Sequence, residues 1–94
     1  MDYLQFANTT IYKIEGSDLD KKFGADVEGL YGEGIKAIYW AVQADAETGE
    51  IVAETQEVML EYADGKFAYT LLWTVYEATL EEALSRMLKS MADA

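Results

Sequence analysis

Apolar and polar residues alternate through the middle of the chain and predict β-strands. The segments Ile35–Ala44, Ile51–Tyr62 and Phe67–Tyr76 are rich in β-branched and aromatic residues. Short polar segments at 47–50 and 63–66 separate them, and each contains a glycine suited to a tight turn. The three segments therefore predict an antiparallel meander.

A further strand and a long connection precede this meander. The segment Thr9–Glu15 has strand-like composition, and the residues before it extend the strand or simply lead into it. Five of the seven glycines fall within Gly16–Gly34 among acidic residues, which predicts an irregular connection. Within it, Ser17 and Asp20 are spaced to cap a single helical turn that ends at Gly24.

The C-terminal segment has the periodicity of a helix. Thr79 followed by Glu82 forms a capping box, which predicts a helix that begins at Leu80. Apolar residues then recur at helical spacing, at Leu80, Ala83, Leu84, Met87, Leu88 and Met91. The predicted fold is thus a single α+β domain over residues 1–94. It has an antiparallel sheet of about four strands, in the order β-loop-β-β-β, with one amphipathic helix packed on a face.

The strand patterns also predict which side chains form the core. Five residues alternate along one face of the last strand, and we expect that face to be buried: Phe67, Tyr69, Leu71, Trp73 and Val75. The strand at 35–44 is apolar on both sides, with Ile38, Trp40 and Val42 sharing one of them. Either the glycine-rich connection covers that side or it forms a homodimer.

Length and composition limit the class of protein. The 94 residues suit one domain, and a hydrophobic content of 51% is that of a folded chain. No apolar run approaches the roughly 20 residues of a membrane-spanning helix, and Asp2 stands where a signal peptide would be basic. Without cysteine, disulfides are excluded. We expect a soluble, cytoplasmic protein.

Catalytic and ligand-binding motifs find little support. The chain has no histidine and no cysteine, so Ser-His-Asp and Cys-His triads cannot form and zinc loses its main ligands. An EF-hand loop starting at Asp18 would need an oxygen ligand at Lys22 and a glycine at Phe23. The glycines at 29–34 lack the lysine of a phosphate-binding loop. We expect neither enzymatic activity nor a cofactor or metal.

The sign of the charge is the unusual feature. Eighteen acidic and seven basic residues give a formal charge of −11, which should repel nucleic acids and anionic membranes and attract basic protein surfaces. Six carboxylates follow the predicted second hairpin: Glu47, Glu50, Glu54, Glu57, Glu61 and Asp64. Alternation places Glu57 and Glu61 on one face, and Glu50 and Glu54 on the other unless a bulge intervenes. These residues either only protect a sheet edge from aggregation or imitate the phosphates of a nucleic acid.

Two functions fit these observations. The first is an inhibitor or regulator whose acidic residues occupy a basic, nucleic-acid-binding surface of a partner protein, with Tyr31 exposed as an aromatic contact. Anti-CRISPR and anti-restriction proteins of phages, and toxin-immunity proteins, are similar to this chain in size and charge, a similarity of composition with no shared motif. The alternative is an oligomeric accessory or structural subunit that associates through an apolar sheet face.

Overall fold

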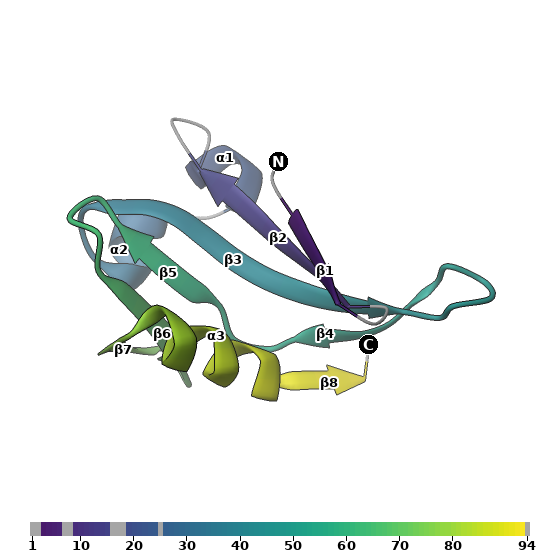
Figure 1. Cartoon of the computed structure of the whole chain (residues 1–94). Helices are drawn as coiled ribbons and strands as arrows, with labels where there is room; N and C mark the ends of the chain where they lie inside the picture. Colours follow the sequence, from purple (N-terminus) through teal and green to yellow (C-terminus); the bar gives the residue numbers. More distant parts are fainter. Residues whose placement is uncertain (1–2, 7–8, 16–18, 25, 94) are drawn as a thin grey trace.

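The computed structural model describes residues 3–6, 9–15, 19–24 and 26–93 (Figure 1). The strands are β1 Tyr3–Phe6, β2 Thr9–Glu15, β3 Ile35–Ala44, β4 Ile51–Thr55, β5 Met59–Tyr62, β6 Phe67–Leu71, β7 Thr74–Ala78 and β8 Met91–Asp93. The helices are α1 Leu19–Phe23, α2 Val27–Tyr31 and α3 Leu80–Lys89. The described strands form one antiparallel sheet in the order β1-β2-β3-β5-β6-β7, with β4 beside the end of β3 and β8 beside β4.

The predicted α+β class, antiparallel sheet and C-terminal helix are confirmed, but the prediction of about four strands was too low. The described residues form eight strands, because the two predicted strands at 51–62 and 67–76 are each divided in two. The short strands β1 and β8 add to the sheet at β2 and β4. Strands of three or four residues are too short to show a recognisable alternation in the sequence.

The division between β4 and β5 is stabilised by hydrogen bonds from neighbouring elements. The N–H of Ala41 in β3 donates to the hydroxyl of Thr55 at 3.1 Å. Beyond it, the N–H of Gln56 donates to the carbonyl of Ser90 at 3.1 Å, and the N–H of Glu57 donates to the Ser90 hydroxyl at 3.0 Å. The end of α3 therefore satisfies backbone groups that leave the sheet at this point.

The division between β6 and β7 is a two-residue turn at Leu72 and Trp73. Both have positive φ, of 50° and 71°, as both central residues of a type I′ hairpin turn require, while Leu71 and Thr74 pair on either side. The prediction that Leu71 and Trp73 belong to the core is wrong, since their side chains are 47% and 80% exposed. No glycine, asparagine or aspartate marks this turn, so the sequence pattern reads through it as one strand.

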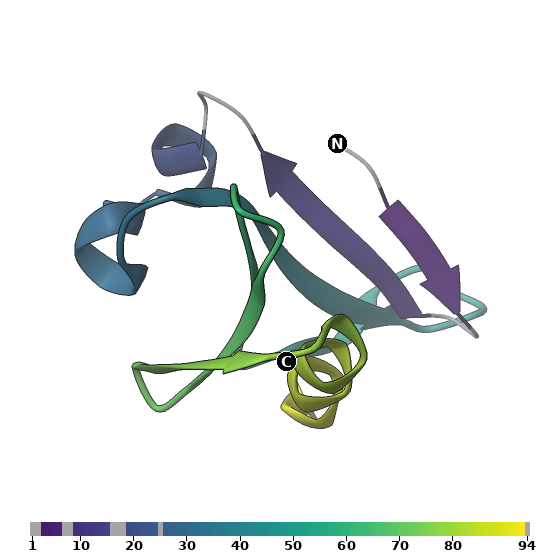
Figure 2. The ribbon, with the colours of Figure 1, turned by 60° about the vertical axis from the view of Figure 1, so that its left-hand side comes forward.

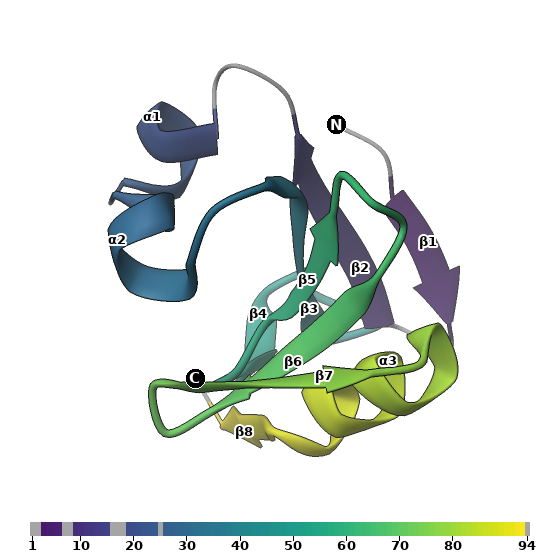
Figure 3. The ribbon, with the colours of Figure 1, turned by 90° about the vertical axis from the view of Figure 1, so that its left-hand side faces the viewer.

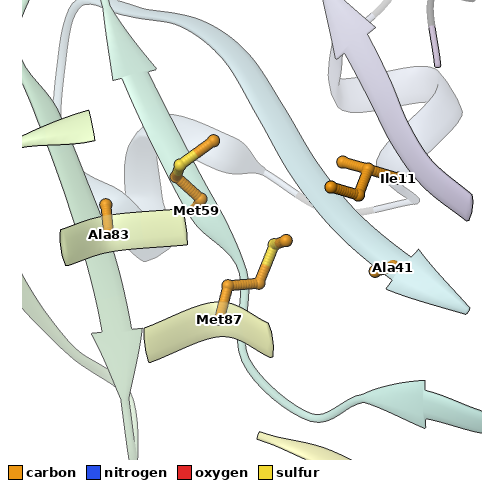
Figure 4. Close-up of a cluster of buried hydrophobic side chains, with 5 residues drawn as sticks. All are labelled: Ile11, Ala41, Met59, Ala83 and Met87. Atoms are coloured by element: carbon orange, nitrogen blue, oxygen red, sulfur yellow. The ribbon is translucent and has the colours of Figure 1, made fainter. Parts of the chain in front are cut away.

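One face of the sheet is covered by α3, as expected. Buried side chains from β2, β3, β5 and α3 pack together there: Ile11, Ala41, Met59, Ala83 and Met87 (Figure 4). The helix begins at Leu80, and the hydroxyl of Thr79 accepts a hydrogen bond from the N–H of Glu82 at 3.2 Å, which confirms the predicted cap. Leu80 itself is exposed and does not share the buried stripe.

The other face is covered by α1 and α2, which lie on the opposite side of β5 and β6 from α3 (Figure 3). Val27 of α2 packs with three buried strand residues, Ile38, Leu60 and Ala68. The prediction of an irregular connection at 16–34 is therefore corrected in its described part. Of the two explanations for the apolar second side of β3, cover by this segment is the one observed.

The helical turn expected to end at Gly24 is confirmed, while Ser17 lies outside the described residues. The N–H of Gly24 donates to the carbonyl of Asp20 at 2.8 Å, and Gly24 has a φ of +81°. A residue with this φ ends a helix at little cost only when it is glycine. A glycine-rich, acidic composition thus conceals two helices of five residues each.

Candidate functional site

Exposed carboxylates gather on the hairpin formed by β3 and β4, which extends from the rest of the molecule in Figure 1. We call this feature the acidic arm and define it by four exposed residues: Asp45, Glu47, Glu50 and Glu54. Three of the six carboxylates predicted to contact a partner, Glu47, Glu50 and Glu54, are therefore brought together here. Asp45 was not singled out in the sequence.

The turn of the acidic arm is closed by its own hydrogen bonds. The carboxylate of Asp45 accepts from the N–H groups of Glu47 at 2.8 Å and Thr48 at 3.0 Å, and these bonds lower the pKa of Asp45. The Asp45 N–H donates to the Glu50 carbonyl at 2.8 Å. The spacing of Asp45 from these donors is that of an Asx turn, a signal already present in the sequence. The carboxylates are thus held on an ordered turn.

A bulge separates the directions of Glu50 and Glu54. Gln43 pairs with Ala53, but the next residue of β3, Ala44, pairs with Ile51, so that Val52 is the extra residue. The prediction that Glu50 and Glu54 share a face required that no bulge intervene, and this bulge lies between them. Glu50 and Glu54 are both exposed, but a continuous strand face does not relate them.

The charge of the acidic arm is not neutralised within the described part of the chain. The ion pairs between described residues are Lys13–Glu15 at 3.0 Å, Lys36–Glu61 at 3.7 Å and Lys66–Glu77 at 3.8 Å. None of them reaches the arm. A concentration of unpaired negative charge at one end of a small molecule favours approach of a positively charged surface.

Glu61 lies in β5 and Glu57 lies in the break before it, so the alternation expected along one continuous strand does not relate the two residues. The Glu61 carboxylate accepts a hydrogen bond from the Tyr39 hydroxyl at 2.7 Å, and Lys36 lies 3.7 Å from it. Burial of Tyr39, followed by this bond to Glu61, raises the pKa of Tyr39 to about 12. The Glu61 carboxylate therefore already has two partners within the sheet, Tyr39 and Lys36.

Glu57 also has partners within the fold, because it lies in the break between β4 and β5. Its carboxylate accepts from the Thr70 hydroxyl at 2.7 Å and from the N–H of Leu72 at 3.1 Å. The Thr70 hydroxyl in turn accepts from the N–H of Val58 at 3.0 Å. Glu57 therefore connects the strand break to the exposed turn between β6 and β7.

Asp64 is separated from the acidic arm by the length of β3. It lies in the turn after β5, and Tyr62 at the end of β5 pairs with Ile35, the first residue of β3. The carboxylate of Asp64 accepts from the N–H of Lys66 at 3.0 Å. The structure thus places Asp64 at the opposite end of β3 from Glu47.

The expectation that Tyr31 is exposed is wrong. Tyr31 ends α2 and is half-buried, with its ring edge-on to Phe23 at 5.9 Å between ring centres. The Tyr31 carbonyl accepts from the Tyr62 hydroxyl at 3.2 Å. Burial raises the pKa of Tyr31, and the negative charge of Glu57 raises it further.

A second surface feature is the apolar tip of the β6–β7 hairpin, which includes Leu71 and Trp73, two residues that the sequence pattern placed in the core. We call it the hairpin tip and define it by exposed apolar residues on and beside the turn: Leu71, Leu72, Trp73 and Tyr76. Figure 2 shows this turn on the same side of the sheet as α2. A groove of about 370 Å³ lies between them, lined by Phe23, Tyr31, Glu57 and Trp73 among others.

Comparison with protein-family models, curated proteins and solved structures finds no match. The longest described helix, α3, has ten residues, and no described helix has the length and apolar character to span a membrane. Across residues 3–6, 9–15, 19–24 and 26–93, acidic side chains do not form a group of three or more suited to a metal ion. The acidic arm and the hairpin tip therefore remain as candidate sites.

Proposed function

We propose that this protein is a binding module without enzymatic activity, and that its acidic arm contacts a basic surface of a partner protein. The observation that carries this proposal is the arm itself. Its exposed carboxylates lie on one projecting hairpin, and no described lysine or arginine pairs with them. A partner surface that binds nucleic acid through lysine and arginine would match this arrangement, so that the protein would act as its inhibitor or regulator.

The contribution of Glu57, Glu61 and Asp64 to this contact is revised. Glu57 and Glu61 lie in and after the break between β4 and β5, outside the arm, and Asp64 lies at the opposite end of β3. We therefore place the arm's own contact with the basic surface on Asp45, Glu47, Glu50 and Glu54. Direct binding of nucleic acid is disfavoured by the formal charge of −11.

The test is affinity capture from the native host at low salt, followed by a high-salt wash. We expect a basic partner that the wash releases, because a contact between exposed charges is screened by salt. The variant E47K/E50K/E54K should lose this partner. The matched control E28K/E33K/E81K reverses three exposed carboxylates outside the arm and makes the same change in net charge. Equal loss in both variants, or retention in the first, would reject the arm as the contact.

One observation favours the alternative of an oligomeric accessory subunit. The apolar surface expected for it on β3 is largely covered, since Ile38 and Val42 are buried. The hairpin tip instead offers exposed apolar area, with Leu72 and Trp73 at 78% and 80% exposure. This alternative predicts self-association that persists at high salt and is lost in L72S/W73S, as measured by analytical ultracentrifugation.

A further inference from the structure

The groove beside the hairpin tip brings aromatic rings together from three parts of the chain. Phe23 is the last residue of α1, Tyr31 is the last residue of α2, and Trp73 lies in the turn after β6. All three line one groove of about 370 Å³. Each ring presents a π-system with a negative face, which attracts a cation near the ring centre.

A carboxylate completes this groove. Glu57 lines it together with the three aromatic residues, and no lysine or arginine is among the described residues that line it. Each Glu57 oxygen accepts one hydrogen bond, from Thr70 or from Leu72, whereas a carboxylate has about four acceptor sites. Arg86 and Lys89 line an adjoining groove with Glu57, but neither forms an ion pair with it among the described residues. Acceptor capacity and negative charge thus remain for an incoming cation.

The turn that carries Trp73 into this position is held in a costly conformation. A left-handed conformation costs about 1–2 kcal/mol for each residue with a Cβ, and both Leu72 and Trp73 have it. An Asn-Gly turn would lower this cost, because asparagine tolerates positive φ and glycine has no Cβ, and it would remove the indole ring from the groove. Costly backbone conformations concentrate at binding sites, which agrees with a role for this turn in recognition.

We infer that this groove binds the cationic end of a lysine or arginine side chain from the partner protein, between the aromatic rings and the Glu57 carboxylate. The inference rests on the proposed function, because a basic partner surface supplies such side chains. A purely apolar side chain fits the groove less well. An apolar side chain would desolvate the Glu57 carboxylate without supplying an opposite charge. A second copy of this chain is disfavoured by its own charge of −11.

The inference is tested by NMR titration of the full chain with single amino-acid derivatives at constant ionic strength. The probes are the N-acetyl, N-methylamide forms of arginine, lysine and norleucine, the last of which is apolar and neutral. We expect the Trp73 indole N–H and the Leu72 amide to shift with arginine or lysine. The affinity of the protein for the arginine or lysine probe should exceed its affinity for the norleucine probe about fivefold or more. Equal shifts with norleucine would overturn the inference.

Two variants locate the binding. Trp73→Ala should weaken the binding of the cationic probes by about tenfold. Because the Trp73 side chain is 80% exposed, its removal should leave the fold intact. Trp73→Phe keeps an aromatic face and should retain most of the affinity. Unchanged binding by Trp73→Ala would reject the groove as the site.

The variant E47Q/E50Q/E54Q separates this inference from the proposed function. It should bind the cationic probes as the wild type does, while losing the salt-sensitive partner in the capture experiment. If the groove fails its test while E47K/E50K/E54K still abolishes capture, only the groove inference is wrong. If that arm variant retains the partner, the proposed function is wrong whatever the probes show.

Discussion

The carboxylate of Glu57 accepts a hydrogen bond from the backbone N–H of Leu72 at 3.1 Å, across fifteen positions of sequence. Leu72 is the first of the two central residues of a turn, and both of them have positive φ. The same carboxylate accepts from Thr70 at 2.7 Å. A single acidic side chain therefore stabilises both the strand break in which it lies and the turn that exposes Trp73.

This relationship predicts that replacement of Glu57 lowers stability more than replacement of an exposed acid. Glu57→Ala leaves the Thr70 hydroxyl and the Leu72 N–H without this acceptor, and should lower the free energy of unfolding by about 1–3 kcal/mol. Urea denaturation measures the change. The control is Glu54→Ala. Because the Glu54 side chain is exposed on β4, this change should alter the free energy of unfolding by about 0.5 kcal/mol or less. Equal effects would show that the Glu57 bonds contribute nothing.

The turn at Leu72 and Trp73 predicts a gain in stability from residues that tolerate positive φ. The variant L72N/W73G should raise the free energy of unfolding by about 1–2 kcal/mol, and Tm by about 5 °C or more, as measured by thermal denaturation. It should also lose binding in the groove, because it removes the indole ring.

The control for this prediction is L72A/W73A. It removes the same side chains but places alanine, which tolerates positive φ poorly, at both positions, so it should show no comparable gain. A similar rise in both variants would assign the effect to the lost apolar surface rather than to the backbone.

The contrast between Thr79 and Glu57 shows what the sequence could predict. Thr79 caps α3 through Glu82, three residues away, so a local motif was enough to place the start of the helix. The partners of Glu57 lie thirteen and fifteen residues away, and no local pattern relates them. Alternation along an assumed continuous strand therefore could not show that Glu57 lies in a strand break.

The candidate sites follow the same division. The acidic arm was found in part because charge is visible in composition, and Glu47, Glu50 and Glu54 are close in sequence. The groove was missed because Phe23, Tyr31 and Trp73 meet only through the tertiary fold. Trp73 in particular was placed in the core, since a turn without glycine or asparagine resembles a continuous strand.

The raised pKa of Tyr39 predicts a loss of stability at high pH. The pKa is about 12 in the folded protein against about 10 in an unfolded chain, so the folded state holds the proton more tightly. The resulting stabilisation is complete below about pH 10 and is lost as the pH rises from about 10 to about 12. Urea denaturation over this range measures it.

The control for this pH effect is Tyr39→Phe. It lacks the titrating hydroxyl and the bond to Glu61, so it should be less stable than the wild type by about 1 kcal/mol near pH 9. The difference between the two proteins should narrow as the pH rises through the titration. A constant difference would contradict the assignment of the raised pKa to Tyr39.

The last prediction concerns the face of α3 that packs on the sheet. Met87 and Leu80 belong to the same predicted apolar stripe, but Met87 is fully buried against the sheet and Leu80 is exposed at the first turn of the helix. Met87→Ala should lower the free energy of unfolding by about 2–5 kcal/mol, because it removes buried contacts and leaves a cavity. Leu80→Ala should cost less than about 1 kcal/mol, since alanine favours the helix and little surface is lost from the core. Comparable losses in the two variants would show that α3 is rotated relative to the packing described. Arg86 and Lys89 would then no longer lie beside Glu57.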